Sequence, residues 1–442
     1  MENTLVENID DFIKILNDDD NRYIGFSLSQ SASGNGILIS NIIFDFHLFH
    51  KKNGKTDSEM FVAIANFLFN KRPRIGFGGI IFNNCKFKKG LSLDFNKKFI
   101  FSNCTFDCFI NIGSGLTNRL IFNERTTFND YVVLETNEAI LTFDNCFFNK
   151  HFIADNATFK RKFRVHDCEF YGDTSFRNTK FNDLADFWCS KFYKKTIFYK
   201  TDFYGSAVFS GVRFKDNVLF TYTLIDKNLI LKGVTPEKGL DLSLAIIPGE
   251  ILIFDFYLSN FKSVSTRYKD QKVYDFDVAE AGLIPTKNKR ETFRILKQAF
   301  ITQNNIVESL PYQKLEKVAL KEEYDHKKGL RNCIDKFVLF LNKWSNDYGS
   351  YPLRSIVFIL LVGWFFFICS IIASNNFSFE FNPANWAFND GVKYFFQYLI
   401  PTHRFDYMGV QTNGWFYFWD FLGRTFVGYG IYQFIQAFRK FR

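Results

Sequence analysis

The chain has 442 residues, of which 19% are aromatic, and Phe alone accounts for 60 of them. The formal net charge of +9 is modest for this length and argues against a strongly acidic protein that imitates nucleic acid. The first sixteen residues are acidic where a secretory signal peptide is basic, and they lack a long apolar run. We therefore expect a reducing cytosol, in which the eight cysteines stay free thiols.

Residues 1–75 are predicted to form a separate segment with helical and mixed structure. Its first apolar residues fall on one helical face: Leu5, Ile9, Phe12, Ile13 and Leu16. The acidic run 17–21 is expected to end that helix, and a second candidate helix begins near Asp57 and runs to Leu68. We expect this segment to form an N-terminal cap on the structure that begins after residue 75.

Two ladders of phenylalanine run through the middle of the chain, each with a period of 11 residues. A small residue, such as Ala157 or Cys168, stands two positions before each ring. This spacing indicates an internal repeat rather than a merely Phe-rich composition. The first ladder begins at Phe148 and continues through Phe159, Phe170, Phe181, Phe192, Phe203 and Phe214. The second comprises Phe176, Phe187, Phe198, Phe209 and Phe220.

The ladders predict a solenoid. A short turn of chain cannot bury a large ring alone, but stacked turns bury it against the turns above and below. Residues two apart in an extended strand point to the same side, so a ring and its small neighbour share the interior. A fully buried Phe contributes about 1.5–3 kcal/mol, which makes the rings the expected main stabiliser of the region.

The stretches LADFWCSKF at 184–192 and KTIFYKTDF at 195–203 resemble the Phe-type pentapeptide-repeat family. That resemblance implies a right-handed quadrilateral β-helix, which we place at residues 76–226. With its flanks, the chain is expected to be mainly β, with α-helical caps and a C-terminal two-helix transmembrane hairpin. The motif is specific for a fold and carries little information about function.

The segments after the ladders differ in composition. Residues 227–285 are predicted to be degenerate coils or irregular structure. Residues 286–350 are predicted to be juxtamembrane helices, with Pro311 starting a new one. They resemble the segment that follows the repeats in membrane-bound members of the same family.

Residues 351–442 are predicted to form the transmembrane hairpin, with spans at 355–374 and 414–438. Ser355 to Ala373 carries no charge over 19 residues, enough at ~1.5 Å per residue to cross a bilayer core. Bases precede the first span and follow the second, whereas the connecting loop 375–412 holds few. This distribution predicts a multi-pass protein with both termini cytoplasmic.

The second span contains Asp420 and Arg424, which lie four residues apart and can pair on one helix face. Charges within a span usually face protein or water, so these two are candidate functional residues, together with Gly423, Gly428 and Gly430. The pair is expected to hold the hairpin or an oligomer together, to line a pore, or to lie at the headgroup interface.

The sequence from Val427 to Gly430 reads VGYG, as in potassium-channel filters. A filter needs an extended loop followed by an inner helix, and too few residues follow here. These glycines are expected to permit close helix packing instead. The chain shows no P-loop, nucleophile elbow or HExxH motif, so we expect no enzyme activity and no metal or cofactor.

The favoured function is a membrane-anchored β-helix scaffold at the cytoplasmic face of a bacterial inner membrane. Its expected partners are the lipid bilayer, an unknown protein and further copies of the chain. The alternative is a membrane-disrupting or pore-forming effector of an anti-phage defence system, whose hairpin oligomerises. A DNA mimic that acts on a topoisomerase, and nucleic-acid binding itself, fit the charge pattern poorly.

Overall fold

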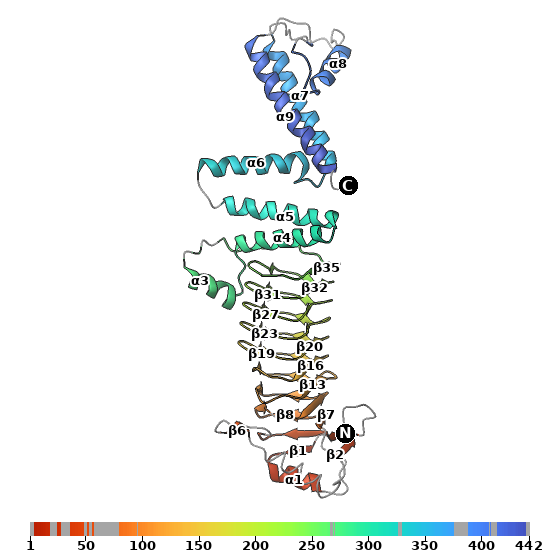
Figure 1. Ribbon diagram of the computed structural model, residues 1–442, viewed down its shortest axis with the longest axis vertical. Coiled ribbons are helices and arrows are strands. Elements are labelled where there is room, and N and C mark those ends of the chain that lie inside the picture. Colours follow the sequence, from red (N-terminus) through yellow and green to blue (C-terminus); the bar gives the residue numbers. More distant parts are fainter. Residues whose placement is uncertain are drawn as a thin grey trace. The chain divides into compact units, whose positions relative to one another are not determined.

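The computed structural model describes residues 4–17, 24–27, 36–47, 51–52, 55–56, 79–94, 96–265, 268, 270–325, 329–374, 388–405, 407 and 413–438. The chain divides into two units, Met1–Ile295 and Leu296–Arg442. The first unit is mainly a parallel β-solenoid and the second is helical (Figure 1). The second helix expected near residues 57–68 lies outside the described residues.

The solenoid consists of short strands that pair with their counterparts in the neighbouring coils. One sheet contains β1 (Thr4–Val6), β4 (Ile42–Phe44), β8 (Lys86–Phe87), β11 (Thr105–Phe106), β14 (Thr127–Phe128), β17 (Phe147–Phe148), β21 (Glu169–Phe170), β25 (Lys191–Phe192), β29 (Arg213–Phe214) and β33 (Thr235–Pro236). A second contains β2 (Ile24–Ser27), β3 (Gly36–Ser40), β7 (Gly79–Asn83), β10 (Lys98–Ser102), β13 (Arg119–Asn123), β16 (Ile140–Asp144), β20 (Phe163–His166), β24 (Ala185–Asp186), β28 (Ala207–Val208), β32 (Leu229–Lys232) and β35 (Ile251–Phe254).

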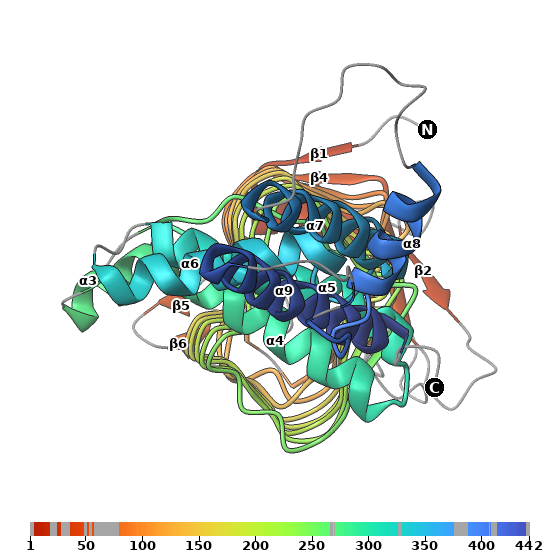
Figure 2. The same ribbon diagram turned by 90° about the horizontal axis from the view of Figure 1, so that it is seen from above.

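The third sheet contains β9 (Leu91–Leu93), β12 (Ile110–Ile112), β15 (Val132–Leu134), β18 (Phe152–Ile153), β22 (Thr174–Ser175), β26 (Thr196–Ile197), β30 (Val218–Leu219) and β34 (Leu240–Asp241). A fourth, shorter sheet contains β19 (Thr158–Phe159), β23 (Lys180–Phe181), β27 (Asp202–Phe203) and β31 (Leu224–Ile225). The pairings between coils are parallel, whereas β2 pairs with β3 antiparallel, as does β5 (Lys51–Lys52) with β6 (Lys55–Thr56). Seen along the stack, the coils superpose as closed outlines (Figure 2).

The number of sides of a coil changes along the solenoid. Coils between β7 and β18 use three sheets, and a fourth side is added at β19, where the isolated bridge from Asn137 to Phe159 starts the fourth sheet. Strands also continue on both sides of the expected segment 76–226. β3 and β4 pair with β7 and β8, and β32 to β35 extend the stack to Phe254.

The ladders of period 11 are resolved into columns of period 22, because each turn of the four-sided part carries two rings of each ladder. Phe148 stacks on Phe170 with ring centroids 4.5 Å apart, and Phe170 stacks on Phe192 at 4.6 Å. Phe176 and Phe198 stack at 5.0 Å in another column. The described ladder rings are at most 2% exposed, so they form the core that the repeat predicts.

The corners explain the 11-residue spacing. Asn145, Asn156, Asp167 and Asn178 all have positive φ angles between 49° and 61°. Asn and Asp tolerate this left-handed conformation better than most residues, and they suit tight turns. The Asn178 side-chain amide donates to Asn156 Oδ1 of the previous coil at 3.1 Å, which links equivalent corners.

The small residues inside the corners satisfy backbone groups. Ser190 is fully buried, and its hydroxyl donates to the carbonyl of Val165 at 2.9 Å while it accepts from the Cys168 amide at 3.2 Å. Thr179 donates to the carbonyl of Ala154 at 2.7 Å in the same manner. Small size at these positions therefore leaves room for the rings, and a hydroxyl there pairs buried backbone atoms.

Helices cover both ends of the stack. Helix α1 (Ile9–Asn17) buries Phe12 and Leu16 against the first coil, where Phe12 lies 5.8 Å from Phe44. Leu5 does not join this helix: it belongs to β1 and is 47% exposed, because the strand pairing of Thr4–Val6 sets its direction. At the other end, helix α4 (Thr286–Thr302) buries Phe293.

A helical strap follows the side of the solenoid before α4 begins. It comprises α3 (Gln271–Asp275) and the π-helix η1 (Phe276–Glu280). Arg177 forms an ion pair with Glu280, and Lys195 Nζ donates to the carbonyl of Glu280 at 2.7 Å. Asn217 donates to the carbonyl of Gly282 at 3.0 Å, so successive coils hold the strap.

The helical unit contains α5 (Ile306–Asp325), α6 (Leu330–Asn346), α7 (Pro352–Ala373), α8 (Phe388–Tyr398) and α9 (Gly414–Phe438). Pro311 does not begin a helix but lies inside α5, where little more than one turn precedes it and few backbone hydrogen bonds are lost. Helices α7 and α9 run side by side as a hairpin, and α6 lies across the end where α7 begins (Figures 1 and 2).

Candidate functional site

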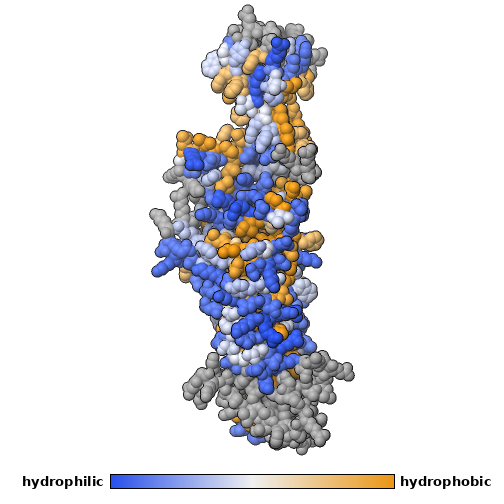
Figure 3. All heavy atoms as spheres, in the orientation of Figure 1, coloured by the Kyte–Doolittle hydropathy of each residue, from blue (hydrophilic) through white to orange (hydrophobic). Residues whose placement is uncertain are grey.

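The α7–α9 hairpin has apolar side chains on its outer surface, and a few polar side chains lie inside it beside a hydrophobic core that includes Phe358 and Phe367. Trp364 and Phe365 of α7 are 58% and 53% exposed, and Phe421 of α9 is 63% exposed. Ser355 and Asp420 are fully buried at the same time. Figure 3 shows hydrophobic residues on the hairpin, with hydrophilic ones among them, whereas the surface of the coils is mostly hydrophilic. The outer surface of a water-soluble helix pair is polar instead.

Asp420 is the centre of a buried charged cluster in the hairpin. Its Oδ2 accepts from Arg424 Nε at 2.7 Å, as expected for residues four apart on a helix. Its Oδ1 lies 2.9 Å from Nε2 of His403, which comes from the connection between α8 and α9. The Asp420 side chain is 0% exposed and that of His403 is 3% exposed, so the carboxylate is buried between Arg424 and the His403 ring.

His403 faces an acceptor on each side of its ring. Its Nδ1 lies 2.7 Å from the carbonyl oxygen of Ile400, and its Nε2 faces the Asp420 carboxylate. A neutral imidazole has one N–H and can donate to one of these acceptors. The ring bridges the Ile400 carbonyl and the Asp420 carboxylate, which ties the α8–α9 connection to α9.

Aromatic rings enclose the cluster. The Arg424 guanidinium lies 3.8 Å from the ring centroid of Phe405, which is a cation–π geometry. Tyr407 packs edge-on against His403 at 4.7 Å. Within the described part of the chain, the buried Oη atoms of Tyr398 and Tyr407 and Nη2 of Arg424 have no hydrogen-bond partner.

The candidate glycines have different surroundings. A Cβ at Gly423 would lie 1.8 Å from Tyr398 Oη, and a Cβ at Gly430 would lie 2.6 Å from Ile359. Gly428 has no atom within 4 Å of its Cβ position. Gly423 and Gly430 therefore allow the close packing that small residues provide between membrane helices, whereas Gly428 does not. Gly363 in α7, near Leu399, serves the same purpose and is a further close-packing position.

A second polar network joins α6 to the far end of α9. Asn346 donates to the Gln433 side chain, and Gln433 donates in turn to Asn342 Oδ1 at 3.1 Å. Tyr429 also donates to Asn342 Oδ1, at 2.8 Å. This network includes Tyr429 of the VGYG sequence, and the whole of that sequence lies within helix α9 rather than in an extended loop.

Sequence reasoning identified the pair Asp420 and Arg424 but missed the residues that surround it. His403 comes from a loop and has no periodic relation to α9, so spacing cannot place it beside Asp420. Gly363, in contrast, was detectable as a small residue in the middle of an apolar run. Within the described ranges, no group of three His, Cys, Asp or Glu side chains is placed to hold a metal ion.

In the part of the chain that the structure describes, one helix is long and apolar enough to cross a membrane. This helix is α7, with a mean hydropathy of 2.9 in a window of which 33% is buried. Comparison with protein-family models, curated proteins and solved structures yielded no match, so the function is inferred from residues and geometry.

Proposed function

We infer that the protein is a membrane-anchored scaffold. Its solenoid is of the pentapeptide-repeat type and provides a rigid surface for an unidentified protein partner at the cytoplasmic face of a bacterial inner membrane. The hairpin of α7 and α9 is the anchor, crosses the bilayer twice and leaves both termini in the cytoplasm. Copies of the chain associate through their hairpins.

The exposed apolar side chains of α7 and α9 carry this proposal, together with the polar groups that are buried in the hairpin. Exposed rings on α7 and α9 are costly in water but suit acyl chains. The charges of α9 do not oppose its insertion, because Arg424 pairs with Asp420 inside the hairpin and His403 contacts the same carboxylate. A buried, paired charge is the usual state of an ionisable residue within a membrane protein.

Membrane fractionation tests the anchor. The full-length protein should stay with membranes after an alkaline carbonate wash, and a L360K/F365K variant, which places two charges on the exposed face of α7, should be released. The control I301K/V307K places the same charges on exposed apolar positions outside the hairpin and should remain bound. Wild-type protein in the soluble fraction would refute the proposal.

The two-span topology has its own test. A protease site inserted between residues 375 and 387 should be cut from outside in spheroplasts, whereas a C-terminal tag should resist until the cells are lysed. A tag that is cut from outside would mean that α9 does not cross the membrane, while the anchor formed by α7 would stand.

The partnerless polar atoms around Asp420 favour a second candidate, the membrane-disrupting effector. Water that enters the hairpin would satisfy Tyr398 Oη, Tyr407 Oη and Arg424 Nη2. An effector should release dye from liposomes as purified oligomers, and a Y398F/Y407F variant should release less. Liposomes that stay sealed with the wild-type protein leave the scaffold as the function.

A further inference from the structure

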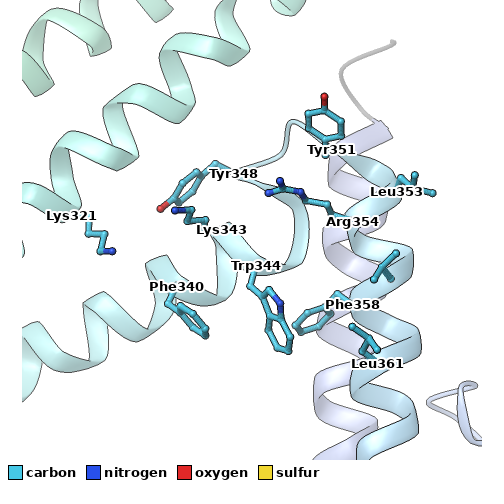
Figure 4. Close-up of a pocket in the computed structure, with 11 residues that line it drawn as sticks. Lys321, Phe340, Lys343, Trp344, Tyr348, Tyr351, Leu353, Arg354, Phe358 and Leu361 are labelled. Carbon is cyan, nitrogen blue, oxygen red and sulfur yellow. The ribbon is translucent and has the colours of Figure 1, made fainter. Parts of the chain in front are cut away.

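A cavity of about 600 Å³ lies at the elbow where α6 turns into α7. Its walls come from the end of α6, the connecting turn, the first turns of α7 and one residue of α5. Figure 4 shows Arg354 extending from α7 toward the connecting turn, and Lys343 of α6 beside Tyr348. We refer to this cavity as the elbow pocket.

One side of the elbow pocket is cationic. It is lined by Lys321, Lys343 and Arg354. Arg354 lies 3.6 Å from Asp347, but Asp347 is shared with Lys314 at 2.7 Å and cannot neutralise both bases. Among the described residues, no carboxylate lies within ion-pair distance of Lys321 or Lys343. The pocket therefore has an excess of positive charge.

The other side of the elbow pocket is apolar. Leu353, Val357 and Leu361 of α7 line it and are 68%, 49% and 53% exposed. Trp344 of α6 adds an aromatic wall, with its ring 5.0 Å from Phe358. These residues lie on the first turns of the helix that we infer to enter the bilayer, beside α6, whose Leu330 and Phe337 are also exposed.

We propose that the elbow pocket binds an anionic phospholipid of the inner leaflet. The bases hold the headgroup phosphate, with Arg354 as the donor best suited to it, and the acyl chain follows Val357 and Leu361 down α7. A soluble acidic peptide would match the bases but not the exposed apolar wall. This inference rests on the membrane anchor proposed above.

The test uses full-length protein in nanodiscs of phosphatidylcholine that contain a minor fraction of phosphatidylglycerol. Native mass spectrometry after release measures which lipid stays bound. Wild-type protein should retain phosphatidylglycerol at least about tenfold over its share in the disc. The K343Q/R354Q variant should lose this preference. The control R331Q/K336Q removes one Arg and one Lys from α6 outside the pocket and should keep it.

Each outcome is decisive. A preference that survives in K343Q/R354Q, or that is lost equally in the control, overturns the proposal, because general surface charge would then explain it. Displacement of the lipid by millimolar glycerol phosphate would also overturn it, because the site would then bind phosphate alone. If K343Q/R354Q misfolds, the K321Q variant replaces it in the test, because Lys321 is exposed. K321Q should weaken the preference for phosphatidylglycerol several-fold.

Failure of the anchor gives a different result. Wild-type protein that does not enter phosphatidylcholine nanodiscs refutes the membrane proposal itself. Protein that enters them but shows no preference for phosphatidylglycerol refutes the lipid site alone.

Discussion

Phe198 of the solenoid is fully buried between Phe176 and Phe220, whereas Phe421 of α9 is 63% exposed. Asp420, next to Phe421, is fully buried. The two regions thus place the same ring in opposite environments. In the solenoid, rings form the interior and polar corners face outward. In the hairpin, rings lie both inside and on the outer surface, and a charged cluster is buried beside the inner ones. The bilayer that we propose around the hairpin would account for this difference, because exposed rings are stable among acyl chains and not in water.

The F198A variant tests the buried rings of the solenoid, and we expect it to have the largest effect. Its ring centroid lies 5.0 Å and 4.8 Å from the rings above and below, so the substitution leaves a cavity that the neighbouring coils cannot fill. We expect a loss of about 3–5 kcal/mol in the free energy of unfolding, measured by urea titration of the β-sheet circular dichroism in detergent. F254A, at a ring that is 69% exposed, should cost about 0.5 kcal/mol or less.

The D420L variant tests the buried cluster of the hairpin, because it leaves Arg424 and His403 without their carboxylate. Removing one partner of a buried ion pair should cost about 3 kcal/mol in an SDS unfolding titration of the protein in micelles. The double variant D420L/R424L should recover most of that loss. D390L, at an exposed position of α8, is the control and should have little effect. A D420L variant as stable as wild type would show that the cluster does not hold the hairpin.

A finer test compares two glycines of α9. G423A places a methyl group 1.8 Å from Tyr398 Oη and should destabilise the hairpin by about 1–3 kcal/mol. G428A meets no atom within 4 Å and should be neutral or stabilising, because Ala favours helix more than Gly does. Thermal unfolding in micelles measures both. G423A/Y398F should recover only part of the loss, because Tyr398 Cζ and Phe366 Cβ lie 2.7 Å and 2.9 Å from the new methyl group. Equal effects of the two single substitutions would contradict the close packing.

The smallest expected effect concerns the one fully buried carboxylate described in the solenoid unit. Asp241 accepts from Thr221 Oγ1 at 2.7 Å and Asn288 Nδ2 at 2.9 Å, and burial raises the pKa of its carboxyl above the ordinary 3.8. The folded protein therefore keeps a proton that the unfolded chain has already lost. The carboxyl of Asp241 therefore contributes fully to the free energy of unfolding when the pH is below its ordinary pKa. This contribution is lost as the pH rises through the raised pKa of the folded state.

D241N removes this pH dependence. Relative to wild type, the variant should gain stability as the pH increases from 4 to 8, by about 1 kcal/mol in urea titrations. The control D255N, at an exposed residue of the same unit, should follow the wild-type profile. Parallel profiles for wild type and D241N would show that Asp241 does not titrate as its burial implies.

The repeat could be predicted from the sequence because it is periodic. Phe159, Phe181 and Phe203 recur at a constant interval, and every turn meets the same environment. The coil formed by β3 and β4 was not predictable in this manner, because 43 residues separate Phe44 from its neighbour Phe87 and hide the period. Asp420 and Arg424 were found from helical spacing, whereas the place of His403 depends on a tertiary contact that no spacing encodes.

The 22-residue separation between stacked rings also bears on how the protein folds. A ring such as Phe170 contacts Phe148 and Phe192, which are both close to it in sequence. Each strand of the four-sided part likewise pairs with strands of the adjacent coils. The entropy of loop closure is then small and nearly the same for each coil. Assembly can propagate from coil to coil, and the solenoid can form on the ribosome while the hairpin is still being synthesised.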